Sequence, residues 1–326
     1  MQKTHIITQS VRICIMLAML CVLIFATEVQ ARTDLMKLAI GYIPHIQFAP
    51  LYVGIEKGLY AEHRIELDIE YGFGIDIFGL LMQEKIDAGL SDSDQLVLAG
   101  SKGLDLVALL QYYQKYPVTI VAKHEHIQAP DDFRGTRIGT PQMEGTSFIG
   151  LQLFLKQFDL QDEVTIEKIG YTQIPSLMSN TIEGAVCFFN NEPIKLRQIG
   201  AQLVQWDVNS FSDLVGASFI TSKALTQKKT DTFERFRQAT IAAMDYTCQN
   251  RDEAYQISLP YINQQEQPDE RFLKEVLAAT CQLFESPRGY GALDLDKYHT
   301  FIRTLHELGL IDAAYPAENI VYNSTE

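Results

Sequence analysis

Short apolar runs alternate with amphipathic segments along the chain from residue 36 onward. The run at residues 36–43 reads MKLAIGYI, and the run at residues 65–72 alternates strictly, with Ile65, Leu67 and Ile69 on one face. Alternation with a period of two is typical of a strand, whereas spacings of three and four are typical of a helix. Strands that alternate with helices predict an α/β fold with mainly parallel sheets flanked by helices.

The layout begins again near the middle of the chain. TIEGAV at residues 181–186 echoes KIDAGL at residues 85–90, and the chain beyond residue 230 has mostly helical patterns. Two copies of one order of elements predict two lobes of one architecture. We expect the first part of lobe I at residues 36–122, lobe II at residues 123–220, and a return to lobe I with C-terminal helices at residues 221–326.

The N-terminus has the layout of a secretory signal peptide at residues 1–31. Two basic residues precede an uninterrupted apolar run at residues 13–26, and Ala31 is a small residue that a signal peptidase accepts. A membrane anchor is the alternative, but the run is shorter than the roughly 20 residues that span a bilayer. A lipoprotein site at Cys21 is disfavoured because Leu20 precedes it. We therefore expect cleavage near Ala31 and export to the periplasm.

Composition and charge narrow the class of protein. The chain has 326 residues, of which 47% are hydrophobic and 21% are charged, and this is enough for two lobes with separate cores. The formal net charge is -14, whereas a nucleic-acid-binding protein needs a basic face. We expect a monomer that binds no nucleic acid.

Cysteine usage and metal motifs give weaker signals. Cys187, Cys248 and Cys281 follow the predicted signal peptide. Separate buried thiols are the favoured interpretation, with a Cys248–Cys281 disulfide as the alternative in an oxidising compartment. No CxxC or HExxH pattern occurs, and HEH at residues 124–126 is interpreted as a solvated loop. We expect neither a metal nor a cofactor.

The turn after the first predicted strand mixes aromatic and hydrogen-bonding side chains. It reads GYIPHIQF and contributes Tyr42, His45, Gln47 and Phe48. Ligands of open α/β sheets bind beyond the carboxyl ends of strands, and aromatic faces with a few polar groups suit a flat heteroaromatic ring. The alternative is that Tyr42 and Phe48 belong to the core and that His45 lies on the surface.

Other strand ends and helix starts supply further candidates for the ligand site. These candidates are Phe73, Ser91, Asp92, Asp94, Gly145, Thr146, Asn191 and Glu192. The alternative for the polar ones is helix capping, which stabilises a helix by about 1 kcal/mol per cap. For Glu192 the ligand role is preferred, because a carboxylate that accepts two N–H bonds discriminates strongly between rings.

Four segments together resemble one family. They read GYIPHIQFAPLYVGIEKGLY from residue 41, EKIDAGLSDSDQLVLAGSKGLDLVAL from residue 84, DDFRGTRIGTP from residue 131 and TIEGAVCFFNNEP from residue 181. The chain resembles the NMT1/THI5-like group of type II periplasmic solute-binding proteins from about residue 37 to about residue 223. The resemblance implies two lobes joined by two crossing strands, near residues 121–124 and 217–222, that close around a ligand.

The resemblance also implies a ligand and a partner. A thiamin pyrimidine precursor is the first choice, because Asn191 and Glu192 match an Asn-Glu pair of that group, and riboflavin is the second. The turn departs from the D-W-x-P-N-x-x-H-x-G pattern of pyrimidine binders, which keeps riboflavin open. An ABC permease would receive the ligand. A periplasmic ligand-sensing protein is a further alternative.

One branch of the family is an enzyme, the thiamin pyrimidine synthase. That branch resembles the binding proteins but requires a lysine, a histidine and a CCCFC motif. The corresponding positions here are Ser91, Gln95 and VGASF at residues 215–219. Without the lysine no Schiff base forms, and without the cysteines iron has no obvious site. No other catalytic motif is present, so we expect a receptor and not an enzyme.

Overall fold

A computed structural model describes residues 32–262 and 269–322. Residues 35–326 form one compact unit, and the account below concerns the described part of that unit. The predicted signal peptide, residues 1–31, lies outside the described residues. Within residues 32–262 and 269–322, none of the helices combines the length and apolar character that crossing a membrane requires.

Two five-stranded sheets form the framework of the unit. The strands of the first sheet are, in spatial order, β2 (Ile65–Tyr71), β1 (Asp34–Ile40), β3 (Ala88–Asp92), β10 (Ala217–Ser222) and β4 (Leu106–Gln111). The strands of the second are β7 (Thr165–Lys168), β6 (Arg137–Thr140), β8 (Gly184–Phe188), β5 (Val118–Lys123) and β9 (Leu203–Asp207). We refer to the two sheets with their flanking helices as lobe I and lobe II.

Each sheet contains one strand that runs against its neighbours. In lobe I this strand is β10, which pairs antiparallel with β3 and β4, while β1 and β3 are parallel. In lobe II it is β5, which pairs antiparallel with β8 and β9, while β6 is parallel to β7 and β8. Both are the first strands that the chain forms after it crosses from one sheet to the other. The two-lobed α/β fold expected from the sequence is therefore confirmed.

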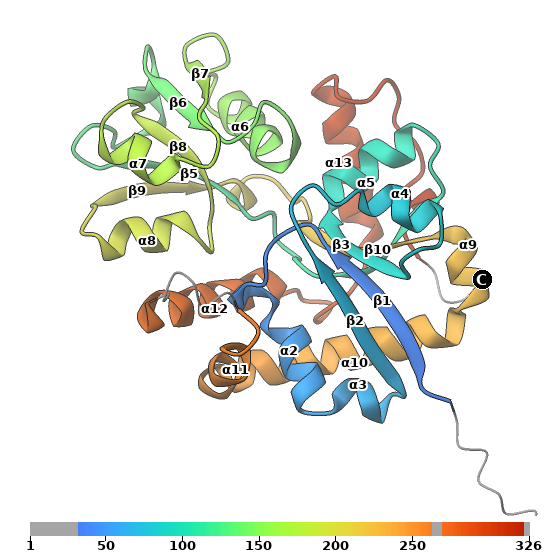
Figure 1. The fold of residues 1–326 in the computed structure, drawn as a ribbon. Coiled ribbons are helices and arrows are strands. Elements are labelled where there is room, and N and C mark those ends of the chain that lie inside the picture. Colours follow the sequence, from blue (N-terminus) through green and yellow to red (C-terminus); the bar gives the residue numbers. More distant parts are fainter. Residues whose placement is uncertain (1–31, 263–268, 323–326) are drawn as a thin grey trace, which may run out of the picture. The chain divides into compact units, whose positions relative to one another are not determined.

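Helices cover both faces of each sheet (Figure 1). They are α2 (Ala49–Glu56), α3 (Leu59–Glu62), α4 (Ile77–Met82), α5 (Ser93–Ser101), α6 (Gly145–Gln157), α7 (Gln173–Met178), α8 (Glu192–Gln198), α9 (Lys223–Lys228), α10 (Thr230–Gln249), α11 (Arg251–Ser258), α12 (Glu270–Phe284) and α13 (Leu295–Glu307). Short 3₁₀ helices lie at η1 (Ile46–Phe48), η2 (Pro130–Phe133), η3 (Val208–Ser210) and η5 (Ala317–Asn319).

Alternation along the strands divides the buried side chains between the two faces of each sheet. In β1, Leu38 and Ile40 pack with α2, α10 and α12, whereas Ala39 packs with α4, α5 and α13. In β5, Ile120 packs toward α6, whereas Val121 packs with α7 and α8. This is the period-two pattern of a sheet covered on both faces.

The two segments that connect the lobes lie side by side. They are residues 112–117 and 208–216, and the N–H groups of Tyr112 and Tyr113 both donate to the carbonyl of Ala217. The buried side-chain amide of Gln111 donates to the carbonyls of Tyr113, at 3.0 Å, and Ala217, at 2.9 Å. The crossings are thereby joined to each other at their lobe I end.

The sequence-based position of the crossings was wrong. Residues 121–124 and 217–222 lie in or just after β5 and β10, inside the two sheets. Hydropathy could not mark the actual crossing, because residues 112–113 and 116 are as buried as the strands beside them. Gly216 is the clearest local signal, since a side chain there would collide with Tyr113 and with the carbonyl of Lys115.

A disulfide joins α10 to α12 through Cys248 and Cys281. Separate thiols were the favoured interpretation for these two residues, and that interpretation was wrong for a structural reason. The two helices are far apart in sequence, and only their packing in lobe I brings the two side chains together. Cys187 is the free, buried thiol of lobe II.

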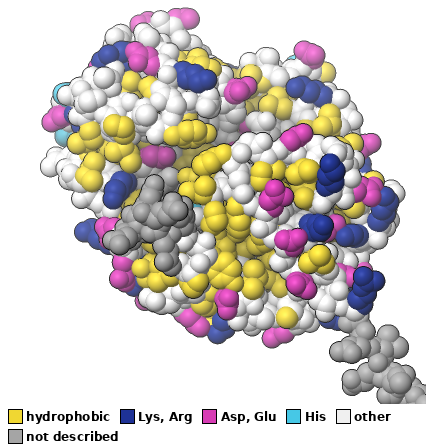
Figure 2. Space-filling model, viewed as in Figure 1, with side chains coloured by type: hydrophobic (Ala, Val, Ile, Leu, Met, Phe, Trp, Pro, Cys, Tyr) yellow, Lys and Arg dark blue, Asp and Glu magenta, His cyan; other side chains and the backbone are white. Residues whose placement is uncertain are grey.

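Charged side chains of both signs are interspersed on the face shown in Figure 2. Hydrophobic side chains gather over the middle of that face, and Lys and Arg are not collected into one basic region there. The cluster at residues 124–126 is a surface loop in which Glu125 pairs with Lys123, at 3.1 Å, and with His126, at 3.3 Å. Among the residues that the structure describes, no group of His, Cys, Asp and Glu is arranged to hold a metal ion.

Candidate ligand-binding site

A cavity of about 580 Å³ is lined by residues of both lobes. Its walls come from the loops after β1, β2 and β3 in lobe I and after β6, β7 and β8 in lobe II, so it lies at the carboxyl ends of the strands. Eleven of the twelve site residues proposed from the sequence line it; the exception, Asp94, lies behind the wall. The volume lies within the range of pockets that enclose small organic ligands.

His45 stands at the start of η1 and is held as a neutral ring. Its backbone N–H donates to the hydroxyl of Tyr52 at 3.2 Å, and its Nδ1 accepts the N–H of Gln47 at 3.5 Å. Burial lowers the pKa of His45 to about 4, so the imidazole is uncharged at neutral pH. Because Nδ1 accepts, the ring proton resides on Nε2, and His45 can act as a neutral donor.

Gln47 is oriented by two tyrosines of the crossing segment. The hydroxyl of Tyr113 donates to Gln47 Oε1 at 2.8 Å, and the hydroxyl of Tyr112 donates to the Gln47 carbonyl at 2.8 Å. Phe48 is only 4% exposed and packs in the lobe I core near Tyr71. Most of its side chain therefore belongs to the core, as the alternative interpretation of the sequence had it. The turn therefore combines one structural aromatic residue with polar groups in fixed orientations.

Exposed aromatic rings lie on both sides of the cavity. Phe73, after β2, is 63% exposed and meets Tyr42 edge-on with ring centroids 5.1 Å apart. Tyr171, after β7, is 75% exposed and lines the cavity from lobe II. Sequence reasoning missed Tyr171 and Tyr113, which follow the ends of β7 and β4, and Phe188, which is the last residue of β8.

Asp92 and Asp94 form a pair of carboxyl groups at the boundary between the lobes. Asp94 is fully buried, and its Oδ1 accepts the hydroxyl of Thr146, from lobe II, at 2.7 Å. The side-chain amide of Gln95 donates to its Oδ2 at 3.0 Å. Burial and the neighbouring Asp92 raise the pKa of Asp94 to about 7. Burial also raises the pKa of Asp92, and a hydrogen bond from Thr146 offsets part of that rise.

Helix capping does not explain these carboxyl groups. Asp92 is the N-cap residue of α5, yet its side chain makes no capping hydrogen bond, and the same holds for Glu144 at α6. Ser91 lies beside Asp92 in the cavity wall. Gly145, with φ +71, begins α6 and places Thr146 next to α5.

Glu192 occupies the first position of α8 and is half-buried. Its Oε2 accepts the N–H of Phe188 at 3.0 Å, and burial raises the pKa of the carboxyl group. Asn191 lines the cavity beside it, whereas the amide of Asn190 donates to Thr280 of α12 at 2.9 Å. Asn191 and Glu192 therefore both line the cavity, and Asn190 links lobe II to α12.

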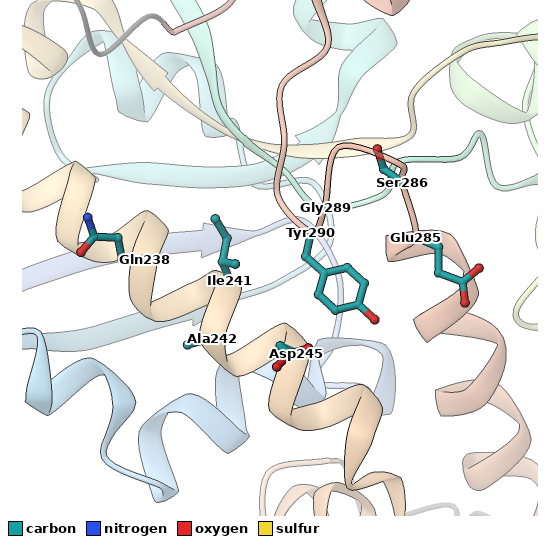
Figure 3. A pocket seen from close by; sticks show the side chains of 8 residues that line it. All are labelled: Gln238, Ile241, Ala242, Asp245, Glu285, Ser286, Gly289 and Tyr290. Atoms are coloured by element: carbon teal, nitrogen blue, oxygen red, sulfur yellow. The ribbon is translucent and has the colours of Figure 1, made fainter.

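A second hollow lies on the outside of lobe I (Figure 3). Its volume is about 760 Å³, and it is bordered by α10 and by the segment that follows α12. Ile241, Asp245 and Tyr290 point into it from the two sides. It is more open than the cavity, and none of the residues proposed from the sequence lines it.

The fold and the cavity together define a class of two-lobed binding proteins. Three solved structures share this fold. They are the periplasmic aliphatic sulphonate-binding protein SsuA of Escherichia coli (TM-score 0.70, 10% identity, covering 89% of this chain and 92% of that one), the ligand-binding component of an ABC-type import system of Staphylococcus aureus (0.67, 14%, 89% and 97%) and the alkanesulfonate-binding protein SsuA of Xanthomonas axonopodis pv. citri (0.66, 13%, 90% and 99%). At these identities the similarity establishes the fold.

Within that class, residues 45–254 match the model of the family described as NMT1/THI5 like, and the chain belongs to this family. It is 28% identical over 266 residues to the riboflavin-binding protein RibY of Chloroflexus aurantiacus, covering 80% of this chain and 76% of that one. It is 21% identical over 331 aligned positions to the formylaminopyrimidine-binding protein of Halalkalibacterium halodurans, covering 95% and 98%. The family resemblance expected from the sequence is therefore confirmed.

Proposed function

We propose that this protein is an extracytoplasmic solute-binding protein that captures a flat heteroaromatic vitamin and delivers it to an ABC permease. The observation that carries the proposal is the cavity itself. Exposed rings from both lobes flank it, and oriented hydrogen-bonding groups line it at the carboxyl ends of both sheets. A planar ring with polar edges is complementary to such a lining.

Riboflavin is the ligand that the cavity supports best. A cavity of about 580 Å³ has room for a fused three-ring system with a side chain, whereas a single pyrimidine would leave much of it to water. The similarity to RibY points the same way. This order reverses the sequence-based preference for a pyrimidine, which rested on the Asn191–Glu192 pair.

A thiamin pyrimidine precursor is the second candidate. Glu192 offers a buried carboxyl group at the cavity wall, suited to accepting hydrogen bonds from an amino group on a ring. A relative that covers nearly the whole chain is named as a formylaminopyrimidine-binding protein. Riboflavin has a ring imide N–H and an aminopyrimidine has an amino group on its ring, and the Asp and Glu side chains of the cavity can accept a hydrogen bond from either.

In the proposed mechanism the protein binds and releases its ligand without changing it chemically. The lobes close about the crossing segments, and the Thr146–Asp94 hydrogen bond joins them in the arrangement described here. Ser91 and Gln95, which stand where the synthase branch carries its lysine and histidine, line the cavity as neutral side chains. Neither can form a Schiff base, so the bound ring is released unchanged.

Native mass spectrometry of the freshly purified protein tests the proposal. We expect a bound mass that corresponds to riboflavin, with a yellow colour, and isothermal titration of the stripped protein should then give a single site for riboflavin. A bound aminopyrimidine with no affinity for riboflavin would select the second candidate. A product that differs chemically from the molecule supplied would overturn the proposal in favour of an enzyme.

A further inference from the structure

The cavity contains several fixed acidic groups and no basic side chain. Among the described residues that line it, the ionisable acids are Asp76, Asp92, Glu144 and Glu192, whereas no Lys or Arg takes part. His45 is held neutral by burial, as described above. A ligand that carries a negative charge would meet acidic groups with no basic side chain to compensate them, and this weakens its binding.

These acids stand at the places where an anion would otherwise bind. Helix N-termini attract anions, because their free N–H groups and the helix dipole create a positive potential. Four helices begin at the cavity, and an acidic residue stands at the start of each one. These residues are Asp76 at α4, Asp92 at α5, Glu144 at α6 and Glu192 at α8.

At the start of α6, an acidic residue of the other lobe occupies the helix N-terminus. Thr146 is the second residue of the helix, and its hydroxyl donates to Asp94, which comes from α5 in lobe I. The carboxyl group of Asp94 therefore supplies an internal acidic partner where a phosphate or sulphonate would otherwise find a donor. Asp92 extends the same acidic wall into the cavity.

We propose that the cavity selects the unphosphorylated, uncharged form of its ligand, and that Asp92 and Asp94 are specificity-determining residues that reject anions. This inference rests on the proposed function and adds to it a ligand class. It also separates this protein from the sulphonate-binding proteins that share its fold. An acidic wall of this kind excludes phosphate esters of the same ring, such as flavin mononucleotide.

The test compares riboflavin with flavin mononucleotide at pH 8, by isothermal titration and by quenching of flavin fluorescence. The full exported protein is used. We expect riboflavin to bind at least about tenfold more tightly than its phosphate ester. Equal affinities would overturn the inference while leaving the proposed function intact. If neither flavin binds, an aminopyrimidine alcohol and its phosphate are compared in the same way. Failure of every neutral ligand would remove the proposed function, and the inference with it.

Substitutions assign the effect to the two carboxyl groups. Asp94→Asn keeps an acceptor for Thr146, and Asp92→Asn removes the charge that Asp92 presents at the cavity wall. We expect each to reduce the preference for riboflavin severalfold, mainly by strengthening binding of the phosphate ester. Asp162→Asn, on an exposed turn before β7, removes the same charge away from the cavity and should leave the ratio unchanged.

An unchanged ratio in both Asp92→Asn and Asp94→Asn would overturn the assignment. If Asp94→Asn does not fold, Asp92→Asn still decides the question, because its side chain reaches the cavity without being fully buried. An equal shift in Asp162→Asn would show that net charge, and not the acidic wall, controls the preference. That outcome would also overturn the inference.

Discussion

The inner cavity and the outer hollow differ in what surrounds them. The hollow is an open depression beside α10, bordered by the ends of surface side chains (Figure 3). The cavity lies where six strands end, and burial displaces the pKa of His45, Asp92 and Glu192 in its wall. Buried polar groups with displaced pKa values mark a candidate binding site more clearly than volume alone does.

The largest expected effect comes from removing the disulfide, which should change the stability of the protein but not its affinity for the ligand. The Cys248–Cys281 disulfide holds α10, a wall of the hollow, against α12. Replacing both cysteines by alanine should lower the free energy of unfolding by about 3 kcal/mol, because the closed loop is lost from the unfolded chain. Chemical denaturation measures this change. Riboflavin affinity of the folded variant should be retained, and a parallel loss of affinity would contradict the separation.

A matched pair of substitutions compares the two regions directly. Glu192→Gln, in the cavity, should weaken binding of the native ring ligand by about 1–3 kcal/mol, because an acceptor for ring N–H groups is replaced by a mixed amide. Glu285→Gln removes the same charge beside the hollow and should have no effect. Isothermal titration measures both. A loss with Glu285→Gln alone would place the ligand in the hollow.

The pH dependence of stability gives a further difference between the surroundings of the cavity and those of the hollow. Because the pKa of Asp94 is raised to about 7, the folded state keeps its proton where the unfolded chain has lost it. The free energy of unfolding should therefore fall as pH rises from 5 to 7, by up to roughly 1 kcal/mol per pH unit from this group. Asp94→Asn should flatten that slope in urea titrations. An identical slope in the variant would show that Asp94 does not titrate there.

The smallest expected effect concerns the exposed rings. Tyr171→Ala should weaken binding by about 1 kcal/mol, since one aromatic contact with the ligand is lost. Tyr290→Ala, in the hollow, is the control and should leave affinity unchanged. Flavin fluorescence quenching is sensitive enough to resolve this difference. If Tyr171→Ala binds the ligand with full affinity, the aromatic ring of Tyr171 in lobe II does not contact the ligand.

The sequence was most informative where a strand ends in polar or aromatic residues. Tyr42, His45 and Glu192 could be placed because periodicity locates strand ends, and strand ends converge on one edge of a sheet. Tyr171 also follows the end of a strand, β7, but it was missed because the loop that carries it matches no motif. Whether it reaches a ligand depends on the position of lobe II relative to lobe I.

Long-range contacts explain the other errors. The Cys248–Cys281 bond depends on how two helices pack, and nothing in the spacing of the cysteines specifies it. The first crossing was misplaced because residues 112–113 and 116 are as buried as the strands beside them. Asp94 was proposed as a ligand contact, but the structure gives its carboxyl group to Thr146 of the other lobe. A partner on another lobe cannot be inferred from local pattern.

The joined crossings have a consequence for how quickly the ligand leaves. Since Tyr113 takes part in the backbone bonding of the crossings and also orients Gln47, any bending there moves a side chain of the cavity wall. Opening the lobes and loosening the ligand are then one event with one barrier. The rate of release to a permease would depend on the stiffness of the two crossing segments as much as on the affinity of the cavity for the ligand.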